Sequence, residues 1–385
     1  MAISPIRKFL VPEMLFGIGC RKLVGQYSKN LGITKVLIVT DPGIIRAGWL
    51  KDVMISLEKH NVDYVVFERV SPNPRDYEVM EGVQLYENEK CNGIIAVGGG
   101  SPMDCAKGIG IVTTNKKDIL YFSGVDKIHV PMPPLICIPT TSGTSSDVSQ
   151  FANIVDSGEK FKIAIISKAI VPDISLIDPE TTSTMDSYLV ATTGIDALVH
   201  AIEAFVSKGR SSFTDLHALE AIKLIVQYLP IRYNDPQNLE ALEKMMLAST
   251  EAGMAFSNAI LGATHAMSHS VGGFLDISHG ECNAMLMNSV ISFNYDSEPE
   301  RFDVIAEVLG LNFKNETSKE RKKAILKKIT EFKANLGIVR KLETVGVKSC
   351  DIPILAKKAY TDPNHITNPK TVSVRDIEVI YEESM

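Results

Sequence analysis

The sequence predicts two domains: an α/β N-terminal domain with a Rossmann-like parallel sheet over residues 1–182, and an all-α C-terminal domain over residues 183–385. Three observations predict them. Short β-branched runs alternate with helix-length segments in the first half, a glycine-rich loop joins a strand to a helix, and apolar residues recur at three- and four-residue spacing in the second half. A chain of 385 residues also exceeds the usual size of one domain, about 100–200 residues.

The strands of the first half are expected in short apolar runs. These are KVLIVTD (35–41), VDYVVFERV (62–70), GIIAVGGG (93–100) and PLICIPTTSGT (134–144). Helix-length segments such as 49–60 and 76–90 separate the runs, which is typical of βα units in a doubly wound sheet. Two later runs, FKIAIIS (161–167) and ISLIDPE (174–180), are expected strands that close this half.

The second half is expected to be helical, because its apolar residues follow helical spacing. The clearest segments are SYLVATTGIDALVHAIEAFVSK (187–208), TDLHALEAIKLIVQYLP (214–230) and NLEALEKMMLASTEAGMAFSNAI (238–260). Thr214 and Asp215 are expected to cap the second helix, and Pro230 is expected to end it. The sequence has no internal repeat and no low-complexity linker, so we expect the domains to pack directly with a cleft between them.

The composition excludes several classes of protein. There are 40 basic and 46 acidic residues and no long basic run, so nucleic acid is not an expected partner. No uncharged apolar run reaches the roughly 18–20 residues that cross a bilayer, and no signal-peptide cleavage pattern follows the N-terminal residues. The six cysteines are scattered without a CxxC motif, as in reduced cytosolic proteins. We therefore expect a soluble, cytoplasmic protein without a membrane partner.

The glycine-rich loop has the features of an anion site. Gly98, Gly99, Gly100 and Ser101 lie between a buried strand and a helix with Pro102 in its first turn. Unpaired amides and the helix dipole would favour a phosphate there, although a tight glycine turn without a ligand is the alternative. The G-x-G-x-x-G pattern is broken, because Met103 takes the place of its last glycine.

Asp41 ends an earlier strand, where a carboxylate can accept hydrogen bonds from ribose hydroxyls and repel a 2′-phosphate. A helix or turn cap is an equally good interpretation of this residue. A second polar loop, PTTSGTSSD (139–147), follows another strand and suits the pyrophosphate or adenine of a dinucleotide. Such loops also occur without ligands.

Histidines are concentrated in LGATHAMSHSVGGFLDISHG (261–280). His265 and His269 are four residues apart on an expected helix, and His279 follows it. Another expected helix offers Asp196 and His200 at the same spacing. Three imidazoles and a carboxylate suit Fe(II), Zn(II), Co(II) or Ni(II) better than Mg(II) or Ca(II), whereas a single pair is more often a hydrogen-bonded helix pair. Five candidates exceed four ligands, which leaves one histidine for proton transfer.

Taken together, these motifs resemble the iron-containing (group III) alcohol dehydrogenases. They are VLIVTD, PNP at 72–74, GGGSPMDCAK, PTTSGTSSD, DPE, GIDALVHAIEAF, GMAFSNAILGATHAMSHSVGGF and HGECNA, in the family's order and along essentially the whole chain. The resemblance implies a dehydroquinate synthase-like two-domain fold with the metal in the cleft. It also implies NAD(H) as cofactor and Fe(II) as metal, with Zn(II) as the alternative.

The resemblance assigns roles residue by residue. It implies that Asp196, His200, His265 and His279 bind the metal, and that His269 is the catalytic histidine near the nicotinamide and the substrate. The implied cofactor contacts are Gly98, Gly99, Gly100, Ser101, Asp41, Asn73, Thr140, Thr141, Thr144 and Lys162.

Two positions depart from the family pattern. Ser145 stands where members commonly have a glycine, which affects the backbone of the second loop. Asn288 and Ser289 stand where many members have Pro-His, which leaves the metal ligands intact but bears on substrate preference.

The implied function is reversible hydride transfer between NAD(H) and a small primary alcohol, diol or aldehyde by a homodimer or larger homo-oligomer. A zinc polyol dehydrogenase or a lyase of the same superfamily is one alternative, for which more polar and basic substrate contacts would be needed. A metal-dependent hydrolase is an alternative of another class, and the absence of NAD(H) binding would favour it.

Overall fold

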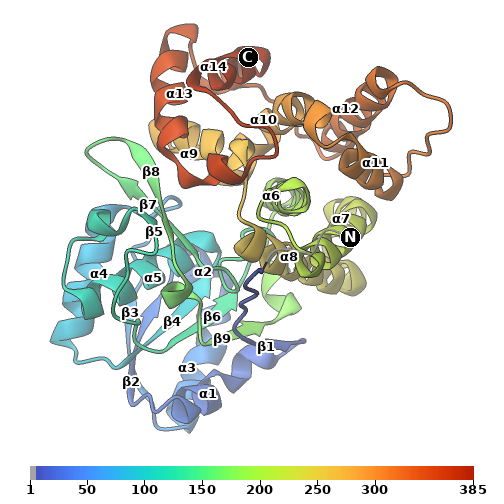
Figure 1. Ribbon diagram of the computed structural model, residues 1–385. Helices are drawn as coiled ribbons and strands as arrows, with labels where there is room; N and C mark the ends of the chain where they lie inside the picture. The colour runs from blue at the N-terminus through green and yellow to red at the C-terminus, as the bar shows by residue number, and fades with distance from the viewer. Residues whose placement is uncertain (1–5) are drawn as a thin grey trace. The chain divides into compact units, whose positions relative to one another are not determined.

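The computed structural model describes residues 6–385, and this part of the chain divides into two compact units (Figure 1). One unit comprises Val11–Met185. The other comprises Asp186–Met385 together with the described residues before Val11. The first unit is built on a parallel sheet and the second is helical, so the predicted fold class is confirmed.

Within residues 6–385, the main sheet has six strands in the order β1-β9-β6-β4-β2-β3, and its strand pairs are parallel. The strands are β1 (Glu13–Phe16), β2 (Lys35–Val39), β3 (Asp63–Phe67), β4 (Gly93–Gly98), β6 (Leu135–Pro139) and β9 (Ile174–Ile177). Successive residues of β4 alternate between two hydrophobic clusters: Ile94 and Ala96 belong to one, Ile95 and Val97 to the other. Both faces of the sheet are therefore buried, as a doubly wound fold requires.

Helices supply the rest of these two clusters. One cluster includes residues of α1 (Val24–Asn30) and α3 (Trp49–Lys59), and the other includes residues of α4 (Asp76–Asn88) and α5 (Gly100–Asn115). The short helix α2 (Pro42–Ala47) follows β2. Short 3₁₀ helices are η1 (Cys20–Leu23), η2 (Ile119–Phe122), η3 (Lys168–Ile170) and η4 (Pro179–Thr182).

A second, smaller sheet has the order β5-β8-β7, with β5 (Gly124–Val125), β7 (Phe151–Asp156) and β8 (Phe161–Ile166). The run FKIAIIS is therefore a strand, as expected, but it pairs antiparallel with β7 instead of joining the main sheet. Three strands, β1, β5 and β7, were not predicted from the sequence. β1 and β5 are only four and two residues long, and β7 carries Asn153 among its apolar residues, so none gives a clear strand pattern.

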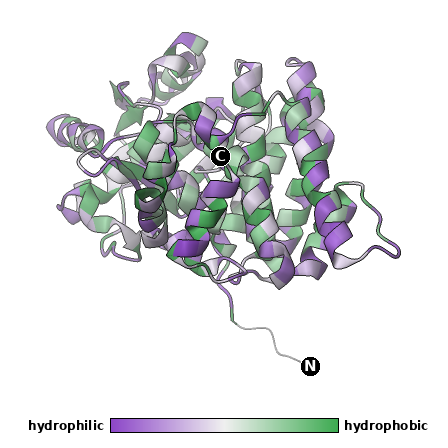
Figure 2. Ribbon diagram, turned by 90° about the horizontal axis from the view of Figure 1, so that it is seen from above, coloured by the Kyte–Doolittle hydropathy of each residue, from purple (hydrophilic) through white to green (hydrophobic). Residues whose placement is uncertain are grey.

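The second unit consists of α6 (Ser187–Val206), α7 (Ser212–Asn234), α8 (Leu239–Ala259), α9 (Ala263–Leu275), α10 (His279–Asn294), α11 (Pro299–Val308), α12 (Ser318–Asn335), α13 (Ile352–Thr361) and α14 (Val374–Glu383). Short 3₁₀ helices are η5 (Tyr295–Ser297), η6 (Leu342–Val345), η7 (Ser349–Asp351) and η8 (Pro363–Thr367). Green and purple segments alternate along many helices, so they carry both apolar and polar residues (Figure 2).

Helix α6 is long and apolar enough to cross a membrane, yet 89% of its most apolar window is buried. This burial is what the core helix of a folded domain shows.

Two predictions about α7 were wrong. The helix is capped by Ser211, whose hydroxyl accepts from the backbone of Thr214, so Thr214 lies one turn inside the helix and is not the cap. Pro230 lies within the helix, which continues to Asn234. A proline still lacks one backbone donor there, and tertiary packing of α7 against α6 and α8 outweighs that loss.

The described residues before Val11 are fixed to the helical unit by specific contacts. Leu10 exchanges two hydrogen bonds with the side chain of Asn258, at 2.7 and 3.1 Å. The Arg7 guanidinium donates to the carbonyl of Lys208, and the Phe9 ring stacks on His217 with centroids 5.4 Å apart. The helical unit is therefore assembled from two separate parts of the sequence.

Candidate functional site

The glycine-rich loop runs from the end of β4 into α5. Gly98 has φ +155°, and Gly99 is the N-cap of α5. A Cβ on Gly99 would lie 3.1 Å from Thr141, and one on Gly100 would lie 2.6 Å from Thr144. The predicted phosphate loop and the second polar loop therefore touch, and at Gly100 the approach is too close for a side chain.

Thr140 connects the two loops. Its backbone N–H donates to the carbonyl of Gly98 at 2.9 Å. Its hydroxyl is buried and has no hydrogen-bond partner within residues 6–385. A buried polar group without a partner costs free energy, so this hydroxyl is suited to a ligand atom next to the amides at the start of α5.

Three more of the predicted cofactor residues are linked to one another through the segment that follows β3. The Lys162 ammonium, on β8, donates to Oδ1 of Asn73 at 2.8 Å, and both residues are buried. The Ser101 hydroxyl donates to the carbonyl of Pro72. The structure thus brings Asn73, Ser101 and Lys162 into one hydrogen-bonded neighbourhood beside the glycine loop.

Asp41 is the N-cap of α2. Its Oδ1 accepts from the backbone of Gly43 at 2.7 Å and of Ile44 at 3.1 Å. The cap, one of the two interpretations of this residue, is therefore observed. One carboxylate oxygen makes both bonds, so a contact of Oδ2 with a ribose stays a prediction.

A buried lysine that the sequence analysis overlooked holds the second loop in place. Lys107 is fully buried, and its ammonium donates to the carbonyls of Ser146, Ser149 and Phe151 at 2.6–2.9 Å. Asp104, one helical turn earlier, accepts from the Ser146 hydroxyl at 2.7 Å. Burial raises the pKa of Asp104 and lowers the pKa of Lys107. Asp104 and Lys107 lie in the GGGSPMDCAK motif. Two charged residues three positions apart in an otherwise apolar helix were the sequence feature that could have identified this buried pair.

Ser145 has φ +52°, the left-handed conformation that glycine adopts without strain. The backbone at position 145 therefore keeps a conformation that suits glycine, although this chain has a serine there.

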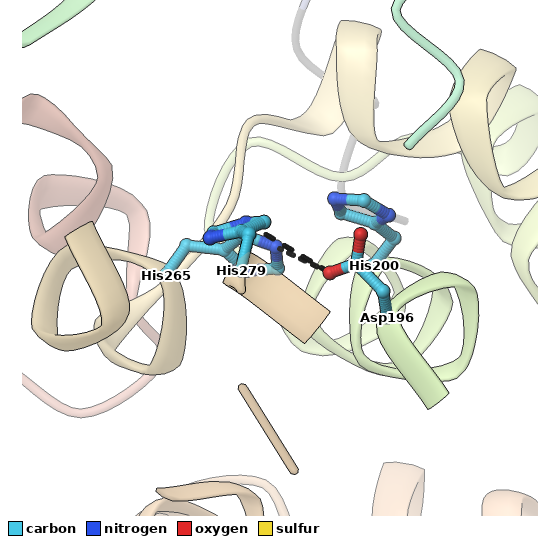
Figure 3. Close-up of side chains that lie close together, drawn as sticks. All are labelled: Asp196, His200, His265 and His279. Atoms are coloured by element: carbon cyan, nitrogen blue, oxygen red, sulfur yellow. Dashed lines mark ion pairs between the residues drawn. The ribbon is translucent and has the colours of Figure 1, made fainter. Parts of the chain in front are cut away.

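The predicted metal ligands form one cluster in the helical unit. Asp196 and His200 lie on α6, His265 on α9 and His279 at the start of α10. One ligand atom from each lies within 4.8 Å of the others, and three of the residues are buried while His279 is half-buried. Figure 3 shows the side chains converging, with Asp196 Oδ1 at 4.0 Å from His265 Nε2 and 3.8 Å from His279 Nε2.

Aromatic rings and an amide surround this cluster. The His200 ring stacks between His265, at 4.6 Å between centroids, and Phe256, at 4.3 Å. The Asn283 Nδ2 donates to Asp196 Oδ1 at 2.6 Å, and its Oδ1 accepts from the Ser268 hydroxyl. Asn283 is fully buried. The sequence analysis missed it, although it lies in the HGECNA motif four residues after His279.

Two buried carboxylates hold histidine rings. Glu203 Oε2 lies 2.6 Å from Nδ1 of His265, and Asp362 Oδ2 lies 2.7 Å from Nδ1 of His269. Burial alone would raise the pKa of each carboxyl, but the histidine partner and nearby hydrogen-bond donors outweigh it and lower both. Because a carboxylate oxygen can only accept, Nδ1 of each histidine is the donor, and in the neutral ring Nε2 is then the lone-pair nitrogen.

His269 lies beside the cluster without contributing to it. Its ring is stacked on that of His279 with centroids 5.1 Å apart. Its Nε2 is buried and has no hydrogen-bond partner in the described part of the chain.

The other departure from the family pattern is at Asn288 and Ser289. The two side chains form hydrogen bonds with different parts of the helical unit. The Asn288 amide donates to the carbonyl of Leu326 and the hydroxyl of Thr330, both on α12. Ser289 Oγ accepts from Ser384.

Comparison with known proteins covers both units. Residues 12–179 match the family described as iron-containing alcohol dehydrogenase, and residues 190–385 match the C-terminal part of the Fe-containing alcohol dehydrogenase family. The chain is 38% identical over 379 residues to the 1,3-propanediol dehydrogenase of Citrobacter freundii, covering 98% of each protein. It is 37% identical over 377 residues to the NAD-dependent methanol dehydrogenase of Bacillus methanolicus, covering 98% of this chain and 99% of that protein. The crystal structure of a 1,3-propanediol oxidoreductase superposes with a TM-score of 0.94 at 36% identity, covering 99% of this chain and 100% of that one.

These matches, with the fold and the histidine cluster, define an oxidoreductase. The chain belongs to the iron-containing alcohol dehydrogenase family. The resemblance inferred from the sequence motifs is thereby confirmed.

Proposed function

We propose that this alcohol dehydrogenase transfers hydride reversibly between NAD(H) and a small primary alcohol, diol or the matching aldehyde, with a divalent metal held by Asp196, His200, His265 and His279. The observation that carries the proposal is the convergence of these four ligand atoms within 4.8 Å. Relatives named for 1,3-propanediol and methanol, one of them NAD-dependent, support the substrate class and the cofactor.

The donor set fits such a metal. Three imidazole nitrogens and one carboxylate oxygen suit Fe(II) or Zn(II), and Glu203 fixes Nδ1 of one ligand ring as metal-bound histidines require. A bound divalent metal would supply Lewis-acid polarisation of the substrate oxygen, and NAD(H) would supply the hydride chemistry. We propose Fe(II) as the native metal, since the family is iron-containing, and Zn(II) as the alternative.

The chain itself would bind the dinucleotide and move the proton. The glycine loop, Thr140 and the amides at the start of α5 offer a phosphate cradle, and Asn73 and Lys162 lie beside it. His269 is the residue that we propose to accept the alcohol proton at Nε2, because Asp362 holds the proton at Nδ1.

The neighbourhood of the ligand cluster favours small, weakly polar alcohols over polyols. Phe256 stacks on His200, and three further apolar side chains close to it in sequence are buried: Met254 on α8, Leu261 between the two helices and Met267 on α9. A zinc polyol dehydrogenase would need more polar contacts to several hydroxyls.

The deciding experiment measures NADH oxidation with a panel of aldehydes, from formaldehyde and propanal to 3-hydroxypropanal and glyceraldehyde, and metal content on the same sample. We expect turnover with the small aldehydes and weak turnover with glyceraldehyde. A metal-loaded sample that neither binds NADH nor oxidises it with any aldehyde would reject the proposal and favour the hydrolase alternative.

A further inference from the structure

Glu203 has no assigned role, although it lies within the GIDALVHAIEAF motif. It is on α6, three residues after His200, and is 4% exposed. Its Oε2 accepts from Nδ1 of His265 at 2.6 Å and from the backbone of Gly262 at 2.9 Å. Its Oε1 accepts from the backbone of Thr264 at 2.7 Å. One carboxylate therefore binds the ring of a predicted metal ligand and the start of the helix that carries it.

The close approach of Glu203 requires a glycine on the opposite side. A Cβ on Gly262 would lie 2.9 Å from Oε1 of Glu203 and 3.0 Å from Oδ1 of Asn368. Asn368 in turn accepts from the backbone of Ala263 at 3.1 Å. The first backbone N–H groups of a helix have no acceptor within the helix. At the start of α9, Glu203 and Asn368 supply the acceptors.

The backbone before this point is strained. Ile260 has φ +61° and ψ 175°, a region that is costly for any residue but glycine. Hydrogen bonds on both sides hold it there: the Ser207 hydroxyl donates to Ala259, and the Thr367 hydroxyl donates to Leu261. Such strain persists only where the surrounding structure fixes the backbone. Here the fixed backbone determines where α9 begins and therefore where the His265 side chain lies.

We propose that Glu203 is a positioning residue for the metal site: it fixes the His265 ring with Nε2 directed at Asp196, and so sets metal affinity without touching the metal. The inference rests on the proposed function, because it takes the cluster to bind a metal. A carboxylate on the second nitrogen of a metal-binding histidine typically contributes about 10–100-fold to metal affinity.

The test measures Co(II) affinity by chelator competition, and the visible Co(II) spectrum, in wild type, Glu203→Gln and Asn368→Ala. In the wild type the two Glu203 oxygens accept from three donors: the N–H groups of Gly262 and Thr264 and Nδ1 of His265. Glutamine replaces one of these oxygens with an N–H₂ group, which cannot accept, so at least one donor loses its partner. We expect Co(II) binding to weaken by about 10–100-fold with an altered spectrum in Glu203→Gln. Asn368→Ala is the matched control, because it also removes a contact at the start of α9 but does not touch His265. It should lower thermal stability and leave the spectrum unchanged.

The outcomes separate the two proposals. Wild-type affinity and spectrum in a folded Glu203→Gln would overturn the positioning role and leave the proposed function intact. The same shift in Asn368→Ala would also overturn it, since the effect would then be general loosening of α9. A wild type that binds no Co(II), Fe(II) or Zn(II) would overturn the proposed function. If Glu203→Gln does not fold, Glu203→Asp, which keeps the charge and shortens the reach, should show the weaker affinity instead.

Discussion

Asp362 and His269 form a buried pair in which the carboxylate Oδ2 lies 2.7 Å from Nδ1 of the ring, while Nε2 has no hydrogen-bond partner within residues 6–385. One nitrogen is anchored and the other is available for chemistry. The neighbouring His265 has the same kind of carboxylate partner, but its Nε2 belongs to the ligand cluster. The two histidines lie four residues apart on α9, but we expect their substitution to have different effects on metal binding.

His265→Ala should lose both metal and activity, because it removes one of the four proposed ligands and leaves Glu203 buried without its ring partner. His269→Ala should keep the metal and lose turnover by about 100-fold or more, the usual contribution of a positioned acid or base. Metal content and kcat measured on both purified variants check this. The assignment fails if His269→Ala is the variant that loses the metal.

Asp362→Asn should lower kcat without changing metal content. The amide can accept a hydrogen bond from Nδ1 but no longer carries the charge that stabilises a protonated ring, so we expect a loss of about 10–100-fold. The pH dependence of kcat separates this effect from misfolding, because loss of the anionic partner should change the profile, whereas partial misfolding should only lower its amplitude. An unchanged profile with wild-type kcat would contradict the role of the pair.

Anaerobic reconstitution with Fe(II) should give the highest activity among Fe(II), Zn(II), Co(II) and Ni(II). Zn(II) should nevertheless bind more tightly than Fe(II), as the general affinity order requires. Purification in air should accordingly yield low or mixed occupancy, as elemental analysis would show. Highest activity with Zn(II) would make the protein a zinc enzyme within an iron-containing family.

Asp41→Asn should shift cofactor preference towards NADPH. Because Asn caps helices about as well as Asp, the bonds to Gly43 and Ile44 are kept while the charge that repels a 2′-phosphate is removed. We expect kcat/KM with NADPH to rise about tenfold relative to NADH, which corresponds to about 1.4 kcal/mol. Asp41→Ala is the control for the cap and should lose about 1 kcal/mol of stability. An unchanged ratio in Asp41→Asn would make this residue a cap alone.

Ser145→Gly should stabilise the sheet unit. It removes the strain of a φ of +52°, partly offset by the greater flexibility of glycine in the unfolded chain, so the net gain is on the order of 0.5–1 kcal/mol. Thermal unfolding should therefore shift upwards by about 1–3 °C. Ser145→Ala keeps the Cβ and should show no gain. A lower melting temperature for the glycine variant would mean that the serine hydroxyl outweighs the strain.

Much of the fold was predictable because strong local patterns agree with the final packing. The runs at β2, β3, β4 and β6 are apolar except for Lys35 and Asp63 at the first positions of β2 and β3, and helices separate them, so composition and length both identify them. β7 was not predictable in this way, since it is stabilised by its antiparallel partner β8 and by the Asp104 carboxylate, which accepts from the backbone of Asn153. Pro230 shows the reverse case, where tertiary packing overrides a local stop signal.

Spacing along the sequence identified five candidate ligands, and the family resemblance selected four of them, Asp196, His200, His265 and His279, which the fold brings together. The residues that orient them were not predictable, since their sequence separations carry no pattern. Asp362 lies 93 positions from His269, and Glu203 lies 62 positions from His265. Only the folded chain brings such carboxylates to the second nitrogen of a histidine.

The split of the helical unit between Ile6–Leu10 and Asp186–Met385 has a consequence for synthesis. Leu10 waits for its partner Asn258 until about 250 further residues have been made, which at about 5–20 residues per second takes some tens of seconds. The sheet unit, by contrast, is complete in sequence at Met185 and can form while the helices are still being translated. A nascent chain arrested far enough beyond Met185 for the whole sheet unit to have left the ribosome should therefore carry a protease-resistant sheet unit, with residues 6–10 still unprotected.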